Sequence, residues 1–82
     1  MSHTRLIHCT FQRDLIREPL LYNLGRDFKV VPNIRGATIS EELGKVYLEL
    51  EGPDTEIDRA VEYLKERGVQ VSDVPEGMPA DP

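Results

Sequence analysis

Asn33 is the polar side chain whose position most suggests chemistry. It lies in "VVPNIRGATI", residues 30–39, among apolar residues and directly after Pro32. Asparagine is depleted in strands, and burying its amide without partners costs free energy. We therefore expect Asn33 to face a ligand or a partner subunit. The alternative is a turn or bulge residue whose side chain bonds its own backbone.

Other reactive residue types are poorly arranged for metal binding. His8 and Cys9 are neighbours, so on a regular strand they point to opposite faces and cannot hold one metal ion together. Cys9 is the only cysteine, which excludes an internal disulfide and favours a reducing compartment. We read Cys9 as a core residue and expect no metal and no cofactor.

Length and charge narrow the class of protein. The chain has 82 residues, which fits one domain, and 15 acidic residues against 10 basic ones give a net charge of −5. This balance disfavours nucleic acid as a partner. No apolar run approaches the roughly 20 residues of a membrane span, and no signal peptide is recognisable. We expect a cytoplasmic domain that does not insert into a membrane.

Three segments show the alternation of strands. In residues 5–11 the better-buried face is formed by Ile7, Cys9 and Phe11. Residues 45–52 alternate most cleanly, and their buried face is formed by Val46, Leu48 and Leu50. The segment 27–40 reads as a further strand, but Pro32 excludes an ordinary central position. We expect an edge strand, a bulge or an irregular entry near residues 31–33.

Two segments show helical spacing. The first is expected to run from near Arg17 to about Gly25, with Pro19 in its first turn. Its apolar stripe is formed by Leu20, Leu21 and Leu24. The second is expected to begin at Asp54 or Thr55, either of which could cap it, and to end at Gly68. A short strand, "VQV", follows the second helix.

The resulting order, β-α-β-β-α-β, predicts an α+β, ferredoxin-like fold: a four-stranded antiparallel sheet with two helices on one face. We assign this domain to residues 4–73 and expect residues 74–82, which are acidic and rich in proline, to form a flexible tail. This chain leaves the other face of the sheet uncovered. The open face is expected to carry Leu6, His8, Thr10, Tyr47 and Glu49. Asn33 joins this face if the irregularity at Pro32 preserves the register.

The open face suits a symmetric dimer contact or a small polar ligand, and the plain alternative is an ordinary solvated face. RNA binding is disfavoured because Tyr47 alone does not form a stacking platform. Acylphosphatases share this topology and use an arginine after the first strand, where Arg13 lies. However, "FQRDLIREP" lacks the glycines that wrap backbone N–H groups around a phosphate. We therefore expect no enzymatic activity.

The stretch from about Ile7 to Val71 resembles the NIL domain family. The matching features are a first helix led by proline, the sequence R-D-F, and Asn-Ile in the second strand. G-x-V-x-L-E-L-E-G and a helix ending in L-x-x-x-G-V-x-V follow at the family's spacing. The Asn-Ile-Leu triplet that names the family reads Asn33-Ile34-Arg35 here.

The resemblance implies a regulatory function. Similar domains form the C-terminal regulatory part of methionine-importing ABC transporter ATPases, where they pair with a twin and bind methionine; others are fused to an iron–sulfur ferredoxin module. This chain contains neither a Walker A sequence nor clustered cysteines, so we expect no ATPase activity and no cluster. A transporter or a sulfur-metabolism protein is the partner that the resemblance implies.

By the same resemblance, Asn33 corresponds to the asparagine that the transporter domains use at the methionine site. Ile34 and Ile39 are candidates for an apolar slot, the backbone around Gly36 could add hydrogen bonds, and Arg35 could hold a carboxylate or lie in solvent. We therefore expect a homodimeric sensor of methionine or a related amino acid. The alternative is an adaptor that docks another protein on its open sheet face, without a small ligand.

Overall fold

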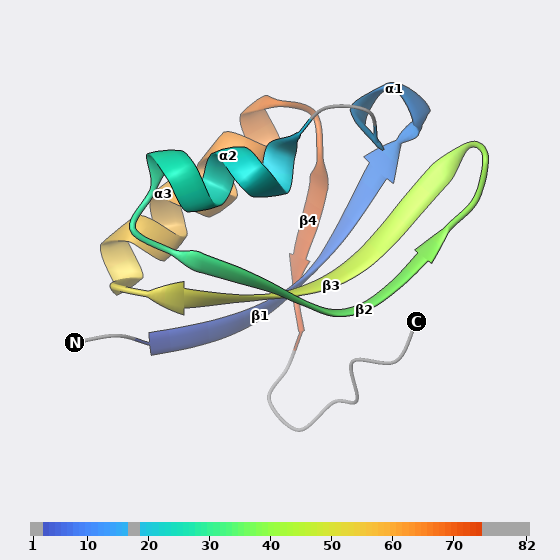
Figure 1. The fold of residues 1–82 in the computed structure, drawn as a ribbon. Coiled ribbons are helices and arrows are strands. Elements are labelled where there is room, and N and C mark those ends of the chain that lie inside the picture. The colour runs from blue at the N-terminus through green and yellow to red at the C-terminus, as the bar shows by residue number, and fades with distance from the viewer. Residues whose placement is uncertain (1–2, 17–18, 75–82) are drawn as a thin grey trace.

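A computed structural model describes residues 3–16 and 19–74 of the chain. Its elements are β1 (His3–Gln12), α1 (Arg13–Ile16), α2 (Leu20–Asp27), β2 (Val31–Ile39), β3 (Leu43–Gly52), α3 (Asp54–Glu66) and β4 (Gln70–Asp73). The strands form one antiparallel sheet in the order β2-β3-β1-β4, and α2 and α3 cover one face of it (Figure 1). The predicted ferredoxin-like arrangement is confirmed.

The two central strands owe their burial to strict alternation. In β1 the side chains of Ile7 and Cys9 are fully buried, and in the paired β3 so are those of Leu48 and Leu50. Ile7 lies directly opposite Leu48, so both side chains project from the same face of the sheet. The expected inward faces of both strands are confirmed.

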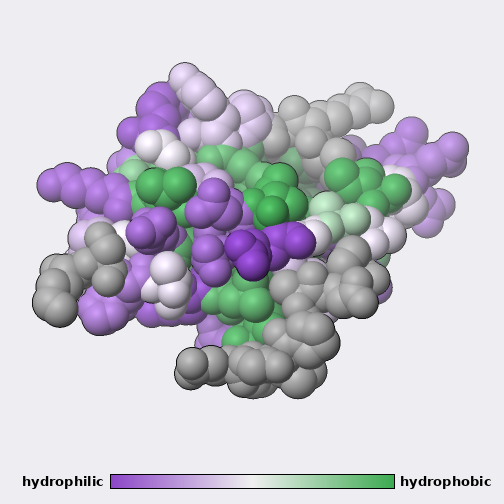
Figure 2. Space-filling model, turned by 60° about the horizontal axis from the view of Figure 1, so that its bottom comes forward, coloured by the Kyte–Doolittle hydropathy of each residue, from purple (hydrophilic) through white to green (hydrophobic). Residues whose placement is uncertain are grey.

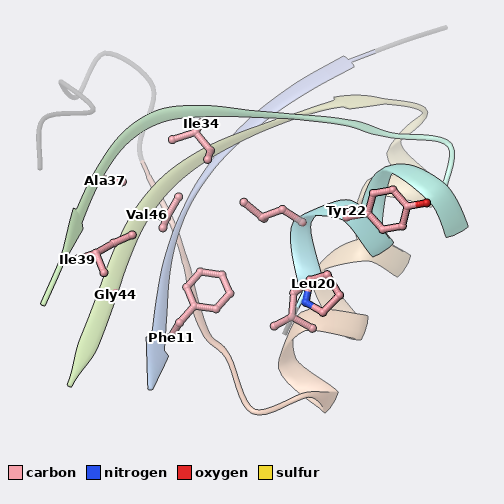
Figure 3. Close-up of a pocket in the computed structure, with 10 residues that line it drawn as sticks. Phe11, Leu20, Tyr22, Ile34, Ala37, Ile39, Gly44 and Val46 are labelled. Carbon is pink, nitrogen blue, oxygen red and sulfur yellow. The ribbon is translucent and has the colours of Figure 1, made fainter. Parts of the chain in front are cut away.

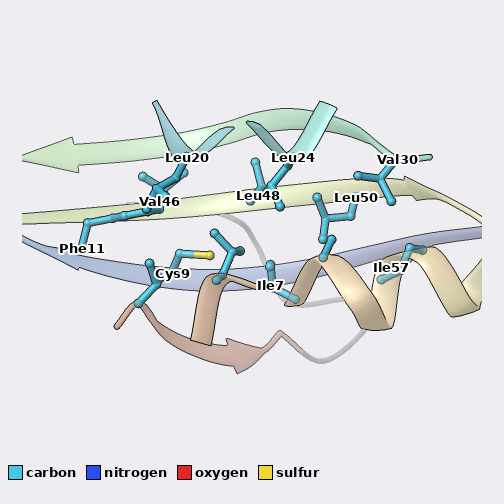
Figure 4. Packing of buried hydrophobic residues seen from close by; sticks show 13 residues of the cluster. Ile7, Cys9, Phe11, Leu20, Leu24, Val30, Val46, Leu48, Leu50 and Ile57 are labelled. Atoms are coloured by element: carbon cyan, nitrogen blue, oxygen red, sulfur yellow. The ribbon is translucent and has the colours of Figure 1, made fainter. Parts of the chain in front are cut away.

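The core fills the space between this face and the helices (Figure 4). Burying a large aliphatic side chain contributes about 1.5–3 kcal/mol, so this one layer supplies most of the fold's hydrophobic stabilisation. Its members are Ile7, Cys9, Phe11, Leu20, Leu24, Val30, Val46, Leu48, Leu50, Ile57, Ala60, Leu64 and Val69.

The first helical segment differs from the prediction at both ends. Helix α2 begins after Pro19, whose carbonyl accepts the N–H of Asn23 at 3.0 Å, and it continues past Gly25 to Asp27. Proline therefore precedes the helix rather than lying within its first turn. The four-residue α1 was not predicted. Residues 17 and 18, where the predicted helix was expected to begin, are outside the described part of the chain.

The end of α3 was predicted correctly and its cap was not. Pro53 is the N-cap, without a side-chain hydrogen bond, so neither Asp54 nor Thr55 caps the helix. At the other end Gly68 adopts a φ of +96°, which favours glycine. Its N–H and that of Val69 donate to carbonyls in the last turn, an arrangement that ends the helix as expected.

Strand β2 lies at the edge of the sheet and pairs only with β3 among the described strands. The edge position agrees with the expectation drawn from Pro32. The pairing register shifts between Ile34 and Gly36, so the irregularity lies slightly later than residues 31–33. The segment leading into β2 is held to α3, because the N–H of Lys29 donates to Glu56 Oε1 at 3.0 Å.

In the described part of the chain, no helix combines the length and apolar character of a membrane span. The predicted tail lies outside the described residues from residue 75 onward, and its flexibility stays a prediction.

Candidate functional site

An apolar pocket opens between the start of α2 and the outer half of the sheet (Figure 3). Its volume is about 240 Å³. In Figure 3 the side chains of Phe11 and Val46 rise from the sheet toward Leu20 on α2, and Ile39 lies on the edge strand beside them. The lining residues are Phe11, Pro19, Leu20, Leu21, Tyr22, Ile34, Ala37, Ile39, Gly44 and Val46.

Small residues on the edge strand β2 and on its neighbour β3 create this hollow. Across the sheet, Phe11 pairs with Gly44, which in turn pairs with Ile39. Gly44 has no side chain, and Ala37, opposite Val46, contributes only a methyl group. Few side-chain atoms therefore cover β2 and β3 at this end of the sheet, and the space below α2 stays open.

Helix α2 supplies the opposite wall. Leu20 is buried and anchors the helix start on the core, whereas Tyr22 is 66% exposed at the rim. The guanidinium carbon of Arg26 lies 5.5 Å from the centroid of the Tyr22 ring, within range of a cation–π contact. The wall thus combines a fixed apolar base with an aromatic rim that faces solvent.

The structure divides the predicted ligand-binding residues between two faces. Ile34 and Ile39 line the pocket together, 58% and 65% exposed. Asn33 lies directly opposite Glu49 and therefore projects from the other, open face. Arg35 is at the register shift, and Gly36 pairs with Tyr47; neither lines the pocket.

The predicted open-face residues lie together on the side of the sheet away from the helices. His8 lies opposite Tyr47, with ring centroids 4.8 Å apart in an edge-to-face contact. Thr10 pairs with Lys45, and Glu49 lies between Leu6 and Asn33. Viewed from this side, Figure 2 shows hydrophilic groups at the centre with separate hydrophobic areas around them.

These surfaces consist of apolar side chains and hydrogen-bonding groups. Burial raises the pKa of the Cys9 thiol to about 12, so this group stays protonated and unreactive near neutral pH. Within residues 3–16 and 19–74, no group of three or more His, Cys, Asp or Glu side chains could hold a metal ion. The pocket offers an apolar slot, to which an aliphatic or thioether side chain is the natural complement.

Reasoning from sequence missed much of the pocket lining. Phe11, Leu20 and Val46 were assigned to buried faces, and Tyr22 was assigned no role. One signal was available: Gly44 and Ala37 are small residues in strands that otherwise carry large apolar side chains. Their cross-strand positions, however, depend on the pairing register, which the sequence does not give directly.

Comparison with known proteins places the chain in a family. The NIL domain family matches residues 5–73. Methionine import ATP-binding protein MetN 1 of Listeria monocytogenes serotype 4b is 36% identical over 74 residues, which cover 85% of this chain and 22% of that protein. Methionine import ATP-binding protein MetN of Halalkalibacterium halodurans is 32% identical over 71 residues, covering 82% and 21%.

The chain thus spans about a fifth of the length of these relatives. The family match covers β1 to β4, including both the pocket and the open face. The chain belongs to the NIL domain family.

Proposed function

We propose that this NIL domain is a non-catalytic regulatory domain that binds methionine or a related amino acid. The observation that carries the proposal is the solvent-facing apolar pocket bordered by Ile34 and Ile39. Exposed isoleucines contribute little to the stability of the fold, and exposed apolar residues beside a pocket are typical of ligand-binding sites.

The size of the pocket limits the ligand. Its volume of about 240 Å³ lies just below the roughly 300–1,000 Å³ typical of ligand sites, so it suits one short apolar side chain. Methionine supplies such a chain, and its thioether adapts to irregular apolar surfaces and contacts aromatic rings favourably. The rings of Phe11 and Tyr22 line the pocket.

The charged end of the amino acid needs polar groups at the rim. Arg35 directly follows Ile34 and could hold the carboxylate. The outward carbonyl groups of β2 could accept hydrogen bonds from the amine. Asn33 projects from the other face, so a contribution from its amide would involve a ligand at the open face or a second copy of the chain.

The relatives support the same ligand class. They are named as ATP-binding proteins of methionine import. A domain that shares about a third of its residues with part of such proteins is suited to act beside a transporter or a sulfur-metabolism protein in the cytoplasm.

A homodimer formed through the open sheet face is part of the proposal. His8, Thr10, Tyr47 and Glu49 are each partly buried, and together they offer aromatic, hydroxyl and charged groups to a symmetric partner. Sedimentation equilibrium tests this part. Tyr47→Glu should reduce the measured mass to that of one chain; a wild-type chain that is already monomeric at millimolar concentration would contradict the dimer.

An adaptor function without a small ligand is the second candidate. The mixture of separate hydrophobic areas and polar groups on the open face favours it, since interfaces with other proteins often have this composition (Figure 2). In that case the pocket would remain empty of free amino acids.

Thermal unfolding with and without ligand separates the two candidates. A ligand present at a hundred times its Kd stabilises the folded state by about 2.7 kcal/mol. Each kcal/mol raises the Tm of a domain of this size by about 4–8 °C. We expect methionine or homocysteine to raise the Tm; no shift with any amino acid at millimolar concentration would favour the adaptor.

Asn33→Ala then tests the amide. Loss of the ligand-dependent shift, with the Tm of the free protein nearly unchanged, would make Asn33 part of the binding site. A large fall in the Tm of the free protein would make Asn33 a structural residue instead.

A further inference from the structure

The exposed apolar side chains of the described residues gather at one edge of the molecule. The large exposed ones are Tyr22, Val31, Ile34 and Ile39. Three of them belong to the edge strand β2: Ile34 and Ile39 line the pocket, and Val31, which pairs with Glu51, projects from the open face. Tyr22 lies across the pocket from that strand. Scattered exposed apolar residues are ordinary, but a row of them along one strand marks a surface that meets another molecule.

The backbone of β2 adds a geometric requirement. Within a sheet, proline occupies edge positions at which its nitrogen faces solvent, so the backbone groups of Pro32 point away from β3. Because these groups alternate along an antiparallel strand, the N–H and C=O of Ile34 also point outward. An extended segment running along β2 is the partner that pairs with such groups.

Charge narrows the chemistry of that segment. The chain carries 15 acidic and 10 basic residues, yet β2 contains one cation, Arg35, and no carboxylate. Among residues 3–16 and 19–74, the Arg35 side chain has no ion-pair partner, whereas Arg5, Arg26 and Arg59 each have one. The edge is therefore complementary to an anionic group on its partner.

We propose that the outer edge of β2 docks an extended, apolar segment of another protein that carries a carboxylate, adding a fifth strand to the sheet. One apolar side chain of the segment enters the pocket beside Ile34 and Ile39, and its carboxylate pairs with Arg35. The docking shares the pocket with the proposed amino-acid site but does not require that site to bind a free amino acid.

A random linear peptide library displayed on phage tests this inference. The library is selected against immobilised wild-type chain after depletion on the Ile34→Lys variant. We expect enriched peptides that combine an apolar residue with Asp or Glu. Synthetic versions should bind the Ile34→Lys and Arg35→Glu variants at least about tenfold more weakly than the wild type. Gln70→Lys, which adds the same charge at the opposite edge strand, should bind like the wild type.

Amide hydrogen exchange supplies an independent readout, and unliganded melting curves verify that each variant folds. A bound peptide should slow exchange at the Ile34 amide, whereas L-methionine should not, so the failure of either proposal can be recognised without the other. Four results would overturn the inference: no enrichment, equal binding to the Ile34→Lys variant, enriched peptides that lack carboxylates, or self-association of the chain that Ile34→Lys abolishes. The last would give the edge to a second copy.

Discussion

Strands β2 and β3 form one hairpin and are similar in length, yet the apolar side chains of β3 are buried and those of β2 are largely exposed. Ile34 of β2 lies directly opposite Leu48 of β3. Leu48 is fully buried, whereas Ile34 is 58% exposed. Leu48 lies between two strands and beneath the helices, and Ile34 lies on the outer strand beside an open pocket. The same residue class therefore serves folding on one strand and is available for recognition on the other.

Strand β4, at the other edge of the sheet, differs from β2 in length and in polarity. Strand β4 is only four residues long and exposes Gln70, Ser72 and Asp73. Short, polar edges resist pairing with other chains. Strand β2 has nine residues and exposes apolar side chains, and only Pro32 and the register shift interrupt it. The two edges thus differ in length and in exposed apolar surface, and both features favour pairing of another strand with β2 rather than with β4.

The largest expected effect is on stability and comes from the buried member of the pair. Leu48→Ala should lower the free energy of unfolding by about 2–5 kcal/mol, because it leaves a cavity in the core. Ile34→Ala should change it by no more than about 0.5 kcal/mol. Urea denaturation of both variants measures the two values, and similar losses would contradict the division between the strands.

Filling the pocket should produce the next largest effect. Ala37→Leu places a large side chain in the hollow beside Val46 and should abolish the methionine-dependent rise in Tm. At a hundred times the Kd, that rise corresponds to a stabilisation of the folded state by about 2.7 kcal/mol. Thr38→Leu is the matched control, since Thr38 pairs with Lys45 on the open face. If Thr38→Leu alone removed the shift, the ligand would occupy the open face.

Thiol labelling compares solvent access at the two strands. Native Cys9 should react with iodoacetamide far more slowly than the Cys in an Ile34→Cys, Cys9→Ala variant, because burial raises the Cys9 pKa to about 12 and closes access. Rapid labelling of native Cys9 would show that the core opens readily.

The same group gives a pH dependence. Above the ordinary pKa of 9.0 the unfolded thiol ionises while the folded one does not. Its contribution to stability is therefore complete below pH 9 and is lost as the pH rises toward 12. A Cys9→Ala variant should lose less stability over that interval.

The smallest expected effect concerns the hydrogen bond between Lys29, just before β2, and Glu56 on α3. Accepting the N–H of Lys29, and then pairing with Arg59, lowers the pKa of Glu56 below its ordinary value of 4.5. Stability from this group is present above that value and declines as the pH falls through the lower, folded pKa. Glu56→Gln should flatten the dependence of Tm on pH in acid, and Glu62→Gln on the same helix should leave it unchanged.

The sequence predicted the parts of the fold that depend on local pattern. Alternation in β3 identified Leu48 and Leu50 as core residues, and Gly68 marked the end of α3. The predicted start of α2 was wrong because proline is compatible both with the first turn of a helix and with the position before it. The Arg35 irregularity was not placed because it depends on pairing with β3.

The candidate site was predictable only in part. Ile34 and Ile39 were expected to form an apolar slot, and the structure brings them to one pocket. Leu20 and Tyr22 complete it from a helix that packs across the sheet, a contact that no local pattern encodes. Asn33 was grouped with them because the family resemblance assigns it to the methionine site, but it pairs with Glu49, and alternation places it on the face opposite to Ile34.

Two-dimensional ¹H–¹⁵N spectra of the chain, recorded during titration with L-methionine, test the central claim most directly. We expect saturable shifts at the amides of Tyr22, Ile34 and Ile39, with little change at His8 and Glu49. Spectra that stay unchanged at millimolar methionine, or that change only on the open face, would contradict it.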